Sequence, residues 1–246
     1  MKTLKSQVRL NDVDLTVCGA DKSACMLFAV AGPCLVTIPL YDVTEVYRKP
    51  GTVAFVEEVI LRQEVIEMLS GKGISVRHGI YTSEDTVNEM HIGGPLTNDR
   101  AWTLFLNHFS SFKYRLHEQT VAVLPEKIKK TRADIIDVVG NESEEGFVVG
   151  GPIGKFIRFD NVRNDCAIIA KLVPSDFSSG VKKTAYFMFG SRLRGTEAAV
   201  RYFLQAVDYL NERFGDGHFF VSMDVNNEDA TIDLSKDFVD LTDVVF

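Results

Sequence analysis

Apolar residues recur at helical spacing in three parts of the chain. Between residues 197 and 214 they return every three or four positions, which predicts an amphipathic helix that ends at Gly215. The same spacing predicts a helix over residues 53–69, where Thr52 can cap the first turn. A shorter helix is expected over residues 100–109.

Short, uninterrupted apolar runs predict strands between and before these helices. Runs bounded by glycine, proline or polar turn residues are typical of strands that are buried in a sheet. They occupy residues 25–30, 34–40, 74–76, 89–92, 112–116, 121–124, 147–149, 165–170, 184–189 and 219–225. The runs at 112–116 and 121–124 are expected to form a pair of strands.

The alternation of strands and helices predicts an α/β chain. It favours a Rossmann-like layered fold with a mainly parallel sheet, because strands that are separated by helices usually pair in parallel. The strand-rich start of the chain is expected to form a β-rich N-terminal extension of residues 1–50. Residues 51–225 then form the α/β domain, and residues 226–246 form an acidic and apolar C-terminal tail.

The composition and charge fit this picture of a packed domain. The chain has 246 residues, of which 46% are hydrophobic and 25% charged, and a net charge of −7. Residues 216–246 hold eight acidic residues and one lysine, so they account for the whole net charge and the remaining chain is neutral. The acidic tail disfavours nucleic acid as a partner, whereas the neutral body leaves room for basic pockets.

The cysteines and the N-terminus point to the cytoplasm. Cys18, Cys25, Cys34 and Cys166 form no C-x-x-C motif and no cysteine and histidine cluster with zinc-site spacing, so we expect reduced core thiols, no metal and no cofactor. No apolar segment follows the N-terminus as in a signal peptide, and the longest apolar stretch is interrupted by glycine and proline. A cytoplasmic protein without membrane contact is therefore expected.

Two similar glycine turns are the first candidate binding loops. Residues 90–96 and 147–153 both place apolar residues before a Gly-Gly-Pro turn, which lets the backbone approach another group closely. A helix follows the first turn and offers its N-terminus to an anion, and two cations follow the second. The candidate ligand-binding residues are Gly93, Gly94, Asn98, Gly150, Gly151 and Lys155. The alternative is that both are tight turns required by packing alone.

A third loop joins the run at 184–189 to the long helix. Two of its glycines have the spacing of a Walker A loop, but Thr196 and Glu197 replace the lysine and the hydroxyl residue, so an NTPase is excluded. The remaining groups suit an anion that is held without hydrolysis, since a guanidinium can bind two oxygens at once. The candidates are Gly190, Ser191, Arg192, Arg194, Gly195 and Thr196. The three loops are expected to meet at the carboxyl edge of the sheet, where ligands bind in open parallel sheets. The alternative is that both arginines are solvated loop charges.

Short motifs resemble known α/β families. The segments 93–98, 165–169 and 190–199 resemble an uncharacterised bacterial α/β domain that is associated with signalling or defence modules. Residues 92–96 are similar to the strand-G-P-L start of nucleoside deoxyribosyltransferases, and residues 186–192 to the strand-G-S-R segment of related nucleotide N-glycoside hydrolases. Those enzymes share a Rossmann-like layout with SLOG and TIR nucleotide-sensing domains, which implies a nucleotide-like ligand. In the enzymes, however, the strand-G-P-L segment opens the chain, whereas here it follows ninety residues.

Candidate catalytic residues are few. Glu197 would lie in the first turn of the long helix and could act as a carboxylate nucleophile, although a glutamate there more often complements the helix dipole. Asp99 and Asp224 are further acid candidates. A basic run at 126–132 is interpreted as a solvated surface, because no aromatic residue interrupts it. The tail at 237–246 alternates acids with apolar residues, so it could dock on a protein partner or a second copy, or pack on its own domain.

Three functions remain open at this point. The first is a sensor module that binds a nucleotide-like or other anionic small molecule and shifts between conformations. The second is an enzyme that cleaves or transfers an N-glycosidic bond on the same scaffold. The third is a non-catalytic assembly protein whose glycine loops are only turns.

Overall fold

The computed structural model describes most of the predicted α/β domain. The described residues are 9–10, 13–14, 27–28, 33–39, 41–42, 52–53, 56–77, 88–109, 111–150, 154–159, 164–173, 184–226 and 238–245. Cys18, Cys25, Gly151 and part of the N-terminal strand predictions lie outside these residues.

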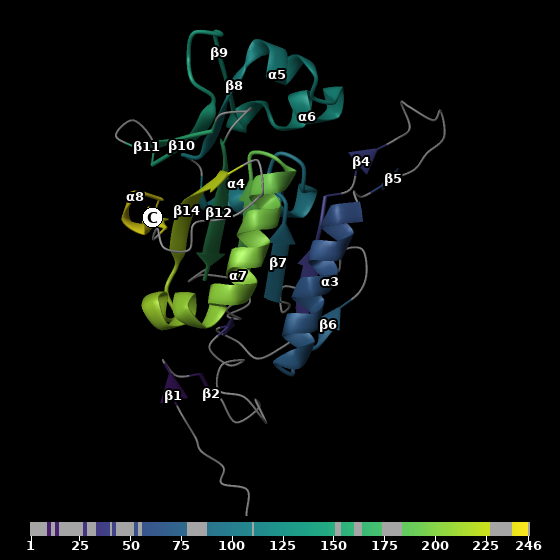
Figure 1. The fold of residues 1–246 in the computed structure, drawn as a ribbon, viewed down its shortest axis with the longest axis vertical. Helices are drawn as coiled ribbons and strands as arrows, with labels where there is room; N and C mark the ends of the chain where they lie inside the picture. Colours follow the sequence, from purple (N-terminus) through teal and green to yellow (C-terminus); the bar gives the residue numbers. More distant parts are fainter. Residues whose placement is uncertain are drawn as a thin grey trace, which may run out of the picture.

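A seven-stranded sheet forms the centre of the molecule (Figure 1). Its strands, in spatial order, are β15 (Val239–Asp240), β14 (Phe219–Asn226), β12 (Asn164–Leu172), β13 (Ala185–Gly190), β7 (Asn88–Ile92), β3 (Cys34–Thr37) and β6 (Val76–Arg77). The neighbours from β13 to β6 pair in parallel, and those from β15 to β13 pair antiparallel. The α/β class is therefore confirmed, but the sheet is mixed because β12, β14 and β15 follow one another as antiparallel neighbours.

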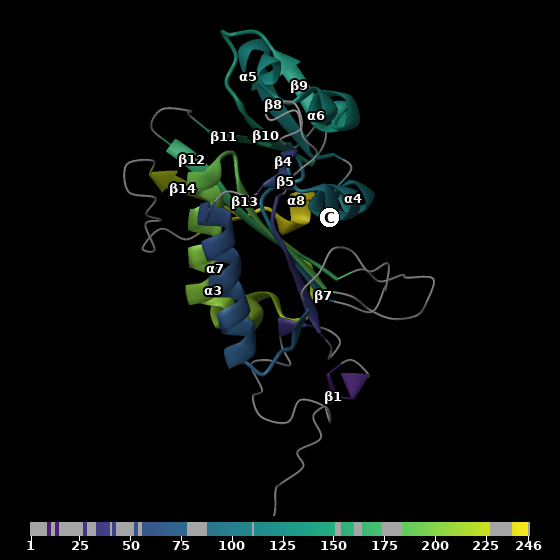
Figure 2. The same cartoon turned by 90° about the vertical axis from the view of Figure 1, so that its right-hand side faces the viewer.

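Helices cover both faces of this sheet. The helices α3 (Val56–Gly71) and α7 (Leu193–Phe214) lie side by side on one face, as Figures 1 and 2 show, and α4 (Asp99–His108) packs on the other. Successive strand residues point to opposite cores: Ile169 and Met188 face α3 and α7, whereas Ile168 and Phe189 face the side of α4. Burial on both faces explains why these strands read as continuous apolar runs rather than as alternating patterns.

A four-stranded sheet lies next to the main sheet. Its order is β11 (Lys155–Arg158), β10 (Gly146–Val149), β8 (Lys113–His117) and β9 (Ile136–Val139). The connections include α5 (Glu118–Ala122), α6 (Glu126–Thr131) and the 3₁₀ turn η2 (Ala133–Ile135). The prediction of a strand at 121–124 is wrong: both edges of β8 pair with β9 and β10, and Val121 and Leu124 pack on the core below α4 instead.

The N-terminal part contributes directly to the main sheet. Strand β3, which the sequence places in the N-terminal extension, lies between β7 and β6. Two short hairpins are also described, β1 (Arg9–Leu10) with β2 (Val13–Asp14) and β4 (Tyr41–Asp42) with β5 (Thr52–Val53). The two buried cysteines of the described chain, Cys34 and Cys166, form no disulfide, and burial raises the pKa of both thiols.

The described part of the acidic tail packs on its own domain. Strand β15 extends the sheet beside β14, and α8 (Thr242–Val245) follows it. Phe238 enters the core below α3 and α7, and Leu241 enters the opposite core. Asp240 and Asp243 remain exposed. Within the described residues, no helix combines the length and apolar character that a membrane span requires.

A buried lysine lies on β12 within the main sheet. Lys171 is 1% exposed, and its Nζ donates to the carbonyl oxygen of Gly215, 2.8 Å away, at the end of α7. Burial lowers the pKa of Lys171 to about 8, and the negative charge of Asp216 opposes this shift. Because the pKa is lower in the folded chain than in the unfolded chain, holding the proton destabilises the fold below pH 8, and this penalty disappears as the pH rises to about 10.5.

Replacing Lys171 with methionine is therefore expected to stabilise the protein at pH 7. The relief of charge burial is worth roughly 3 kcal/mol. The lost hydrogen bond offsets about 1–2 kcal/mol of it, so the net gain is on the order of 1–2 kcal/mol. Urea denaturation at pH 7 and near pH 10 should show the gain at the lower pH only. Lys130→Met, at an exposed position of α6, is the control, and a gain for Lys171→Met that does not change with pH would contradict this account.

Candidate functional site

A cleft of about 140 Å³ lies at the carboxyl ends of the parallel neighbours β7 and β13. It is lined by the first glycine loop, by the third glycine loop, by α3 and by β8. The lining residues are Glu58, Gly93, Gly94, Leu96, Thr97, Tyr114, Gly190, Ser191, Arg192, Leu193 and Thr196. The predicted convergence of loops is thus found for two of the three.

The first loop brings the backbone close to two neighbouring side chains. Gly93 has φ +88°, and a Cβ there would lie 2.5 Å from Pro39 Cγ. A Cβ on Gly94 would lie 2.5 Å from the Tyr114 hydroxyl, which belongs to β8 of the smaller sheet. Both positions therefore require glycine for packing reasons, and the same close approach places Tyr114 at the cleft.

Asn98 holds the first loop in place. Its Oδ1 accepts hydrogen bonds from the backbone N–H groups of Arg100 and Ala101, which caps α4. Its Nδ2 donates to the Ile92 carbonyl oxygen at 3.0 Å and to Thr37 Oγ1 at 3.1 Å. Asn98 is a candidate ligand residue from the sequence, but it does not line the cleft, and in the structure its side chain ties the end of β7 to β3 and α4.

A buried network of charged and polar side chains supports the first glycine loop at the strand that precedes it. Glu89 on β7 is 1% exposed and receives two hydrogen bonds from the Arg100 guanidinium, at 2.7 and 2.5 Å. His91, two residues along the strand, lies with Nε2 3.3 Å from Glu89 and with Nδ1 2.8 Å from Thr37 Oγ1. The network fixes α4 against β7, so the loop between them has little freedom.

A second anchor reaches the first loop from the smaller sheet. Arg132 is 4% exposed and lies over the Trp102 ring, 4.0 Å from its centre. Its guanidinium donates to the Pro95 carbonyl oxygen at 3.3 Å and to the Asp99 carboxylate. Arg132 thus joins the segment after α6 to the loop that lines the cleft.

An internal carboxylate organises the third loop. Asp165, at the start of β12, is 1% exposed. It accepts hydrogen bonds from the backbone N–H groups of Cys166, Ser191, Arg192 and Gly195 at 2.7, 3.0, 3.3 and 2.6 Å, and from the Ser191 hydroxyl. The sequence suggests that the N–H groups at the start of α7 receive an external anion, but Asp165 occupies three of those in the loop. An external anion has to be held mainly by side chains.

The glycines of the third loop allow the helix to approach the strands. A Cβ on Gly190 would lie 2.5 Å from the Cys166 carbonyl oxygen, and one on Gly195 would clash with the same oxygen. Thr196 adds a further tie, since its hydroxyl accepts from the Gly190 N–H and donates to the Arg192 carbonyl oxygen, both at 3.1 Å. The Walker-like spacing of the glycines therefore reflects close packing of α7 against β12 and β13.

The two loop arginines occupy different places. Arg192 lines the cleft, whereas Arg194 does not and points along the helix, with one guanidinium nitrogen 3.9 Å from Glu197. Glu197 also pairs with Arg201 at 3.1 Å and lies outside the cleft lining. Because α7 begins at Leu193, Glu197 lies beyond its first turn, so the expected first-turn position is wrong and the carboxylate instead forms ion pairs along the helix surface.

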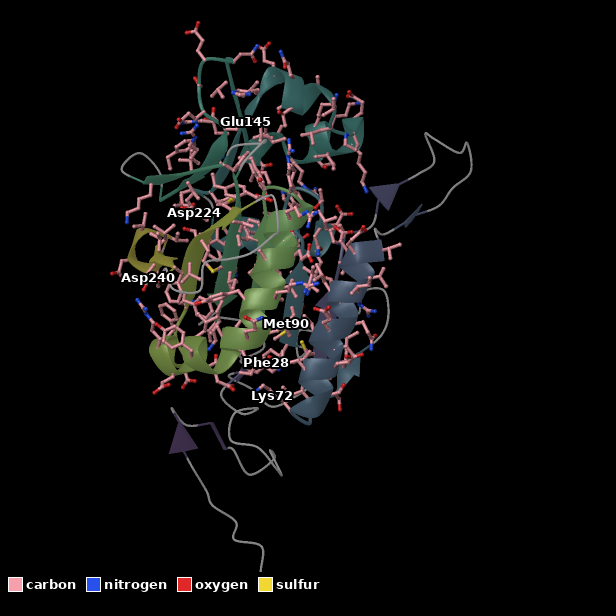
Figure 3. The ribbon with its side chains drawn as sticks, in the orientation of Figure 1. Phe28, Lys72, Met90, Glu145, Asp224 and Asp240 are labelled. Atoms are coloured by element: carbon pink, nitrogen blue, oxygen red, sulfur yellow. The ribbon has the colours of Figure 1, made fainter. Side chains whose placement is uncertain are left out.

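The other acid candidates also lie away from the cleft. Figure 3 shows Asp224 on β14, which is next to the edge strand β15, and its side chain is exposed. Asp99 is 61% exposed and pairs with Lys127 at 3.5 Å and with Arg132. Neither carboxylate is among the cleft residues.

The second glycine turn lies elsewhere. It connects β10 to β11 in the smaller sheet, and a Cβ on Gly150, where φ is +80°, would lie 2.5 Å from Val244 of α8. Lys155 is exposed on β11, and Gly151 lies outside the described residues. Gly150 and Lys155 do not line the cleft with the other two loops.

Three important residues are not predicted from the sequence, and two of them carry no signal of their own. Glu58 looks like the other acidic residues of α3, and Tyr114 looks like an ordinary strand residue. Asp165 could have been suspected, because it is a single acid at the start of a fully apolar run. Burial raises the pKa of Tyr114, while a hydrogen bond with the Leu96 backbone acts in the opposite direction, so the hydroxyl keeps its proton and can donate into the cleft.

Among the described residues, no group of three or more histidine, cysteine, aspartate and glutamate side chains is arranged to hold a metal ion. Comparisons with protein-family models, with curated proteins and with solved structures return no match.

Proposed function

We propose that this chain is an α/β module that binds a nucleotide-like or other anionic small molecule in the cleft between the first and third glycine loops. The observation that carries the proposal is the meeting of these loops at the ends of β7 and β13, with Arg192 among the lining residues. The two strands are parallel neighbours, and ligands of α/β sheets bind at that edge. The parallel strands from β13 to β6, with α3 and α7, form the Rossmann-like part of the proposal.

The cleft offers donors that suit an anion. Arg192 supplies a charged guanidinium, and the hydroxyls of Thr97 and Tyr114 can donate to oxygen. The loops that carry these groups are fixed by Asp165, Asn98 and Arg132, so little ordering is needed on binding. A preorganised site of this kind can bind an anionic group through side chains alone, without the backbone N–H groups at the start of α7.

The proposed biological role is that of a sensor. Tyr114 belongs to the smaller sheet, and the other lining residues belong to the loops and helices of the main sheet. A ligand that contacts both parts stabilises the arrangement in which they are closed around it, and thus shifts the population of conformations. The enzyme alternative gains no support, because Glu197 lies outside the cleft.

A thermal-shift screen tests the proposal. At ~100 times its dissociation constant, a ligand should add about 2.7 kcal/mol of stability. Nucleoside monophosphates, cyclic nucleotides, NAD and inorganic phosphate are suitable probes. We expect Arg192→Ala to remove the shift and Arg194→Ala to preserve it, because only Arg192 lines the cleft.

The pair of arginine variants makes the test specific. Both residues are exposed and lie two positions apart, so their replacement should have similar small effects on folding. Equal loss of binding in both variants would indicate a general charge effect rather than this cleft. No shift with any probe would leave the non-catalytic assembly protein as the better hypothesis.

A further inference from the structure

We infer that the outer face of α3 is a dimer interface, in which this helix packs antiparallel against α3 of a second copy of the chain. The face consists of Val56, Val59, Ile60 and Gln63, all of which are exposed. None of these residues lines the cleft, so the inference does not depend on whether the cleft binds an anion.

The helix α3 is apolar on two opposite faces. Its inner face packs into the core through residues such as Leu61 and Val65, which are 2% and 0% exposed. On the outer face Val56, Val59 and Ile60 are 70%, 48% and 49% exposed. A helix that is apolar all round is normally covered on all sides. The other large apolar residues that the described chain exposes are scattered singly over different elements, so this face is the one that calls for a partner.

The geometry of the outer face allows it to pack on itself. Its four residues are spaced at i, i+3, i+4 and i+7, so they form one stripe along the helix. A twofold axis brings the same surface of two copies together. If the axis passes at Ile60, the two Ile60 side chains meet, and Val56 of each copy lies near Gln63 of the other. No charged residue belongs to the stripe.

Two glutamates flank this stripe on the side of α7. Glu57 and Glu64 lie on the same side of α3 as Lys72, because helical positions that differ by seven or eight residues share a side. The Lys72 ammonium lies 3.1 Å from the carboxylate of Asp208 on α7. Figure 1 shows the two helices next to each other, and both begin at the cleft. The side of α3 next to α7 is therefore acidic over its first turns.

The facing half of α7 is basic. Arg194 and Arg201 are 55% and 54% exposed, and they share one carboxylate, that of Glu197, at 3.9 and 3.1 Å. The outer surface of the helix pair thus carries an acidic strip on α3 and a basic strip on α7. A surface that holds both signs side by side can be complementary to a second copy of itself.

An antiparallel arrangement brings the opposite charges of two copies together. The contact of Lys72 with Asp208 aligns the two helices, so that Arg201 lies at the level of Val65 in the same copy. Reversal about Ile60 moves Arg201 of one copy close to the level of Glu57 of the other. The same reversal moves Arg194 close to the level of Glu64. The charges therefore favour a second copy in this orientation as the partner that covers the apolar stripe.

Analytical ultracentrifugation of the full chain tests the inference. We expect a monomer–dimer equilibrium between about 1 μM and 1 mM, because a single pair of helices gives a small interface. Ile60→Glu should raise the dissociation constant at least about tenfold, since it places two carboxylates opposite each other at the axis. The matched control is Val123→Glu, at a position that is 82% exposed and outside α3, and it should leave the dissociation constant unchanged.

An exchange of charges tests the orientation of the two copies. One variant combines Arg194→Glu with Arg201→Glu, and the other combines Glu57→Arg with Glu64→Arg. Each variant alone should dimerise more weakly than the native chain, because like charges then face each other. An equimolar mixture should form a dimer again, now with one copy of each variant. Only folded chains can restore the dimer, so this result separates a lost interface from a lost fold.

Three results would overturn the inference. A chain that stays monomeric up to the highest concentration has no such interface. A dimer with the native dissociation constant in Ile60→Glu uses another surface. A dimer that Ile60→Glu weakens, but that the mixture of charge variants does not restore, contradicts the antiparallel arrangement.

Discussion

Replacement of Asp165 with alanine should lower the free energy of unfolding by about 3 kcal/mol or more. The carboxylate accepts from the N–H groups of Ser191, Arg192 and Gly195, and it is buried at the junction of β12 and α7. Alanine leaves these donors without their partner, and each unsatisfied buried group costs about 1–3 kcal/mol. Chemical denaturation of the variant and of the native chain measures the difference.

Two further variants show whether the hydrogen bonds are the cause. Asp165→Asn keeps the size of the side chain and one of its oxygens, so we expect its free energy of unfolding to lie between those of the native chain and the alanine variant. Asp224→Ala is the control, because Asp224 lies opposite Cys166 on the neighbouring strand but is exposed, and its loss should be within about 0.5 kcal/mol. A stable Asp165→Ala protein would show that the third loop does not depend on the internal carboxylate.

Gly195→Ala should be similarly destabilising, for a steric reason. The added Cβ would lie 2.6 Å from Asp165 Oδ2 and would clash with the Cys166 carbonyl oxygen. Relief requires α7 to move away from β12, which breaks the hydrogen bonds of Asp165 as well. Overpacking of this kind costs typically 1–3 kcal/mol, and we expect a value at or above the upper end.

Gly71→Ala is the comparison for Gly195→Ala, because Gly71 lies in α3, the helix next to α7 on the same face of the sheet. Gly71 is the last residue of α3, and a Cβ there meets no heavy atom within 4 Å. Alanine at this position should be neutral or stabilising by up to about 1 kcal/mol. Thermal unfolding of both variants compares a glycine required by packing with one that is not, and equal effects would show that the fit around Gly195 is loose.

The sequence predicts the main helices and most central strands because their apolar spacing is long and regular. The helix α7 and the strands β7, β12, β13 and β14 follow directly from this pattern. The antiparallel pairing of β12, β14 and β15 does not follow, because a strand buried on both faces reads the same in either direction. The sequence pattern does not predict the helical turn of α5, because a four-residue apolar run fits a strand as well as one turn of a helix.

The candidate site is only partly predictable from the sequence. The glycines mark where the backbone can turn sharply, but they do not show which strands lie next to each other in the sheet. The first and third loops meet because β7 and β13 are neighbours, and the second lies away because β10 belongs to another sheet. Arg192 and Arg194 are equivalent in sequence, and only the direction of α7 distinguishes them. Asp165 and Glu58 come from strands and helices far away along the chain, so their positions depend on the tertiary fold.

Backbone amide chemical shifts, recorded while adenosine 5′-monophosphate is titrated into the labelled protein, test the central claim most directly. The account predicts saturable shifts at the loop residues that line the cleft, and none at Gly150 or Lys155, which lie in the other sheet. The loop residues of the lining are Gly93, Gly94, Leu96, Thr97, Gly190, Ser191, Arg192, Leu193 and Thr196. Shifts centred on Gly150 and Lys155, or no saturable shift at the cleft residues, would contradict it.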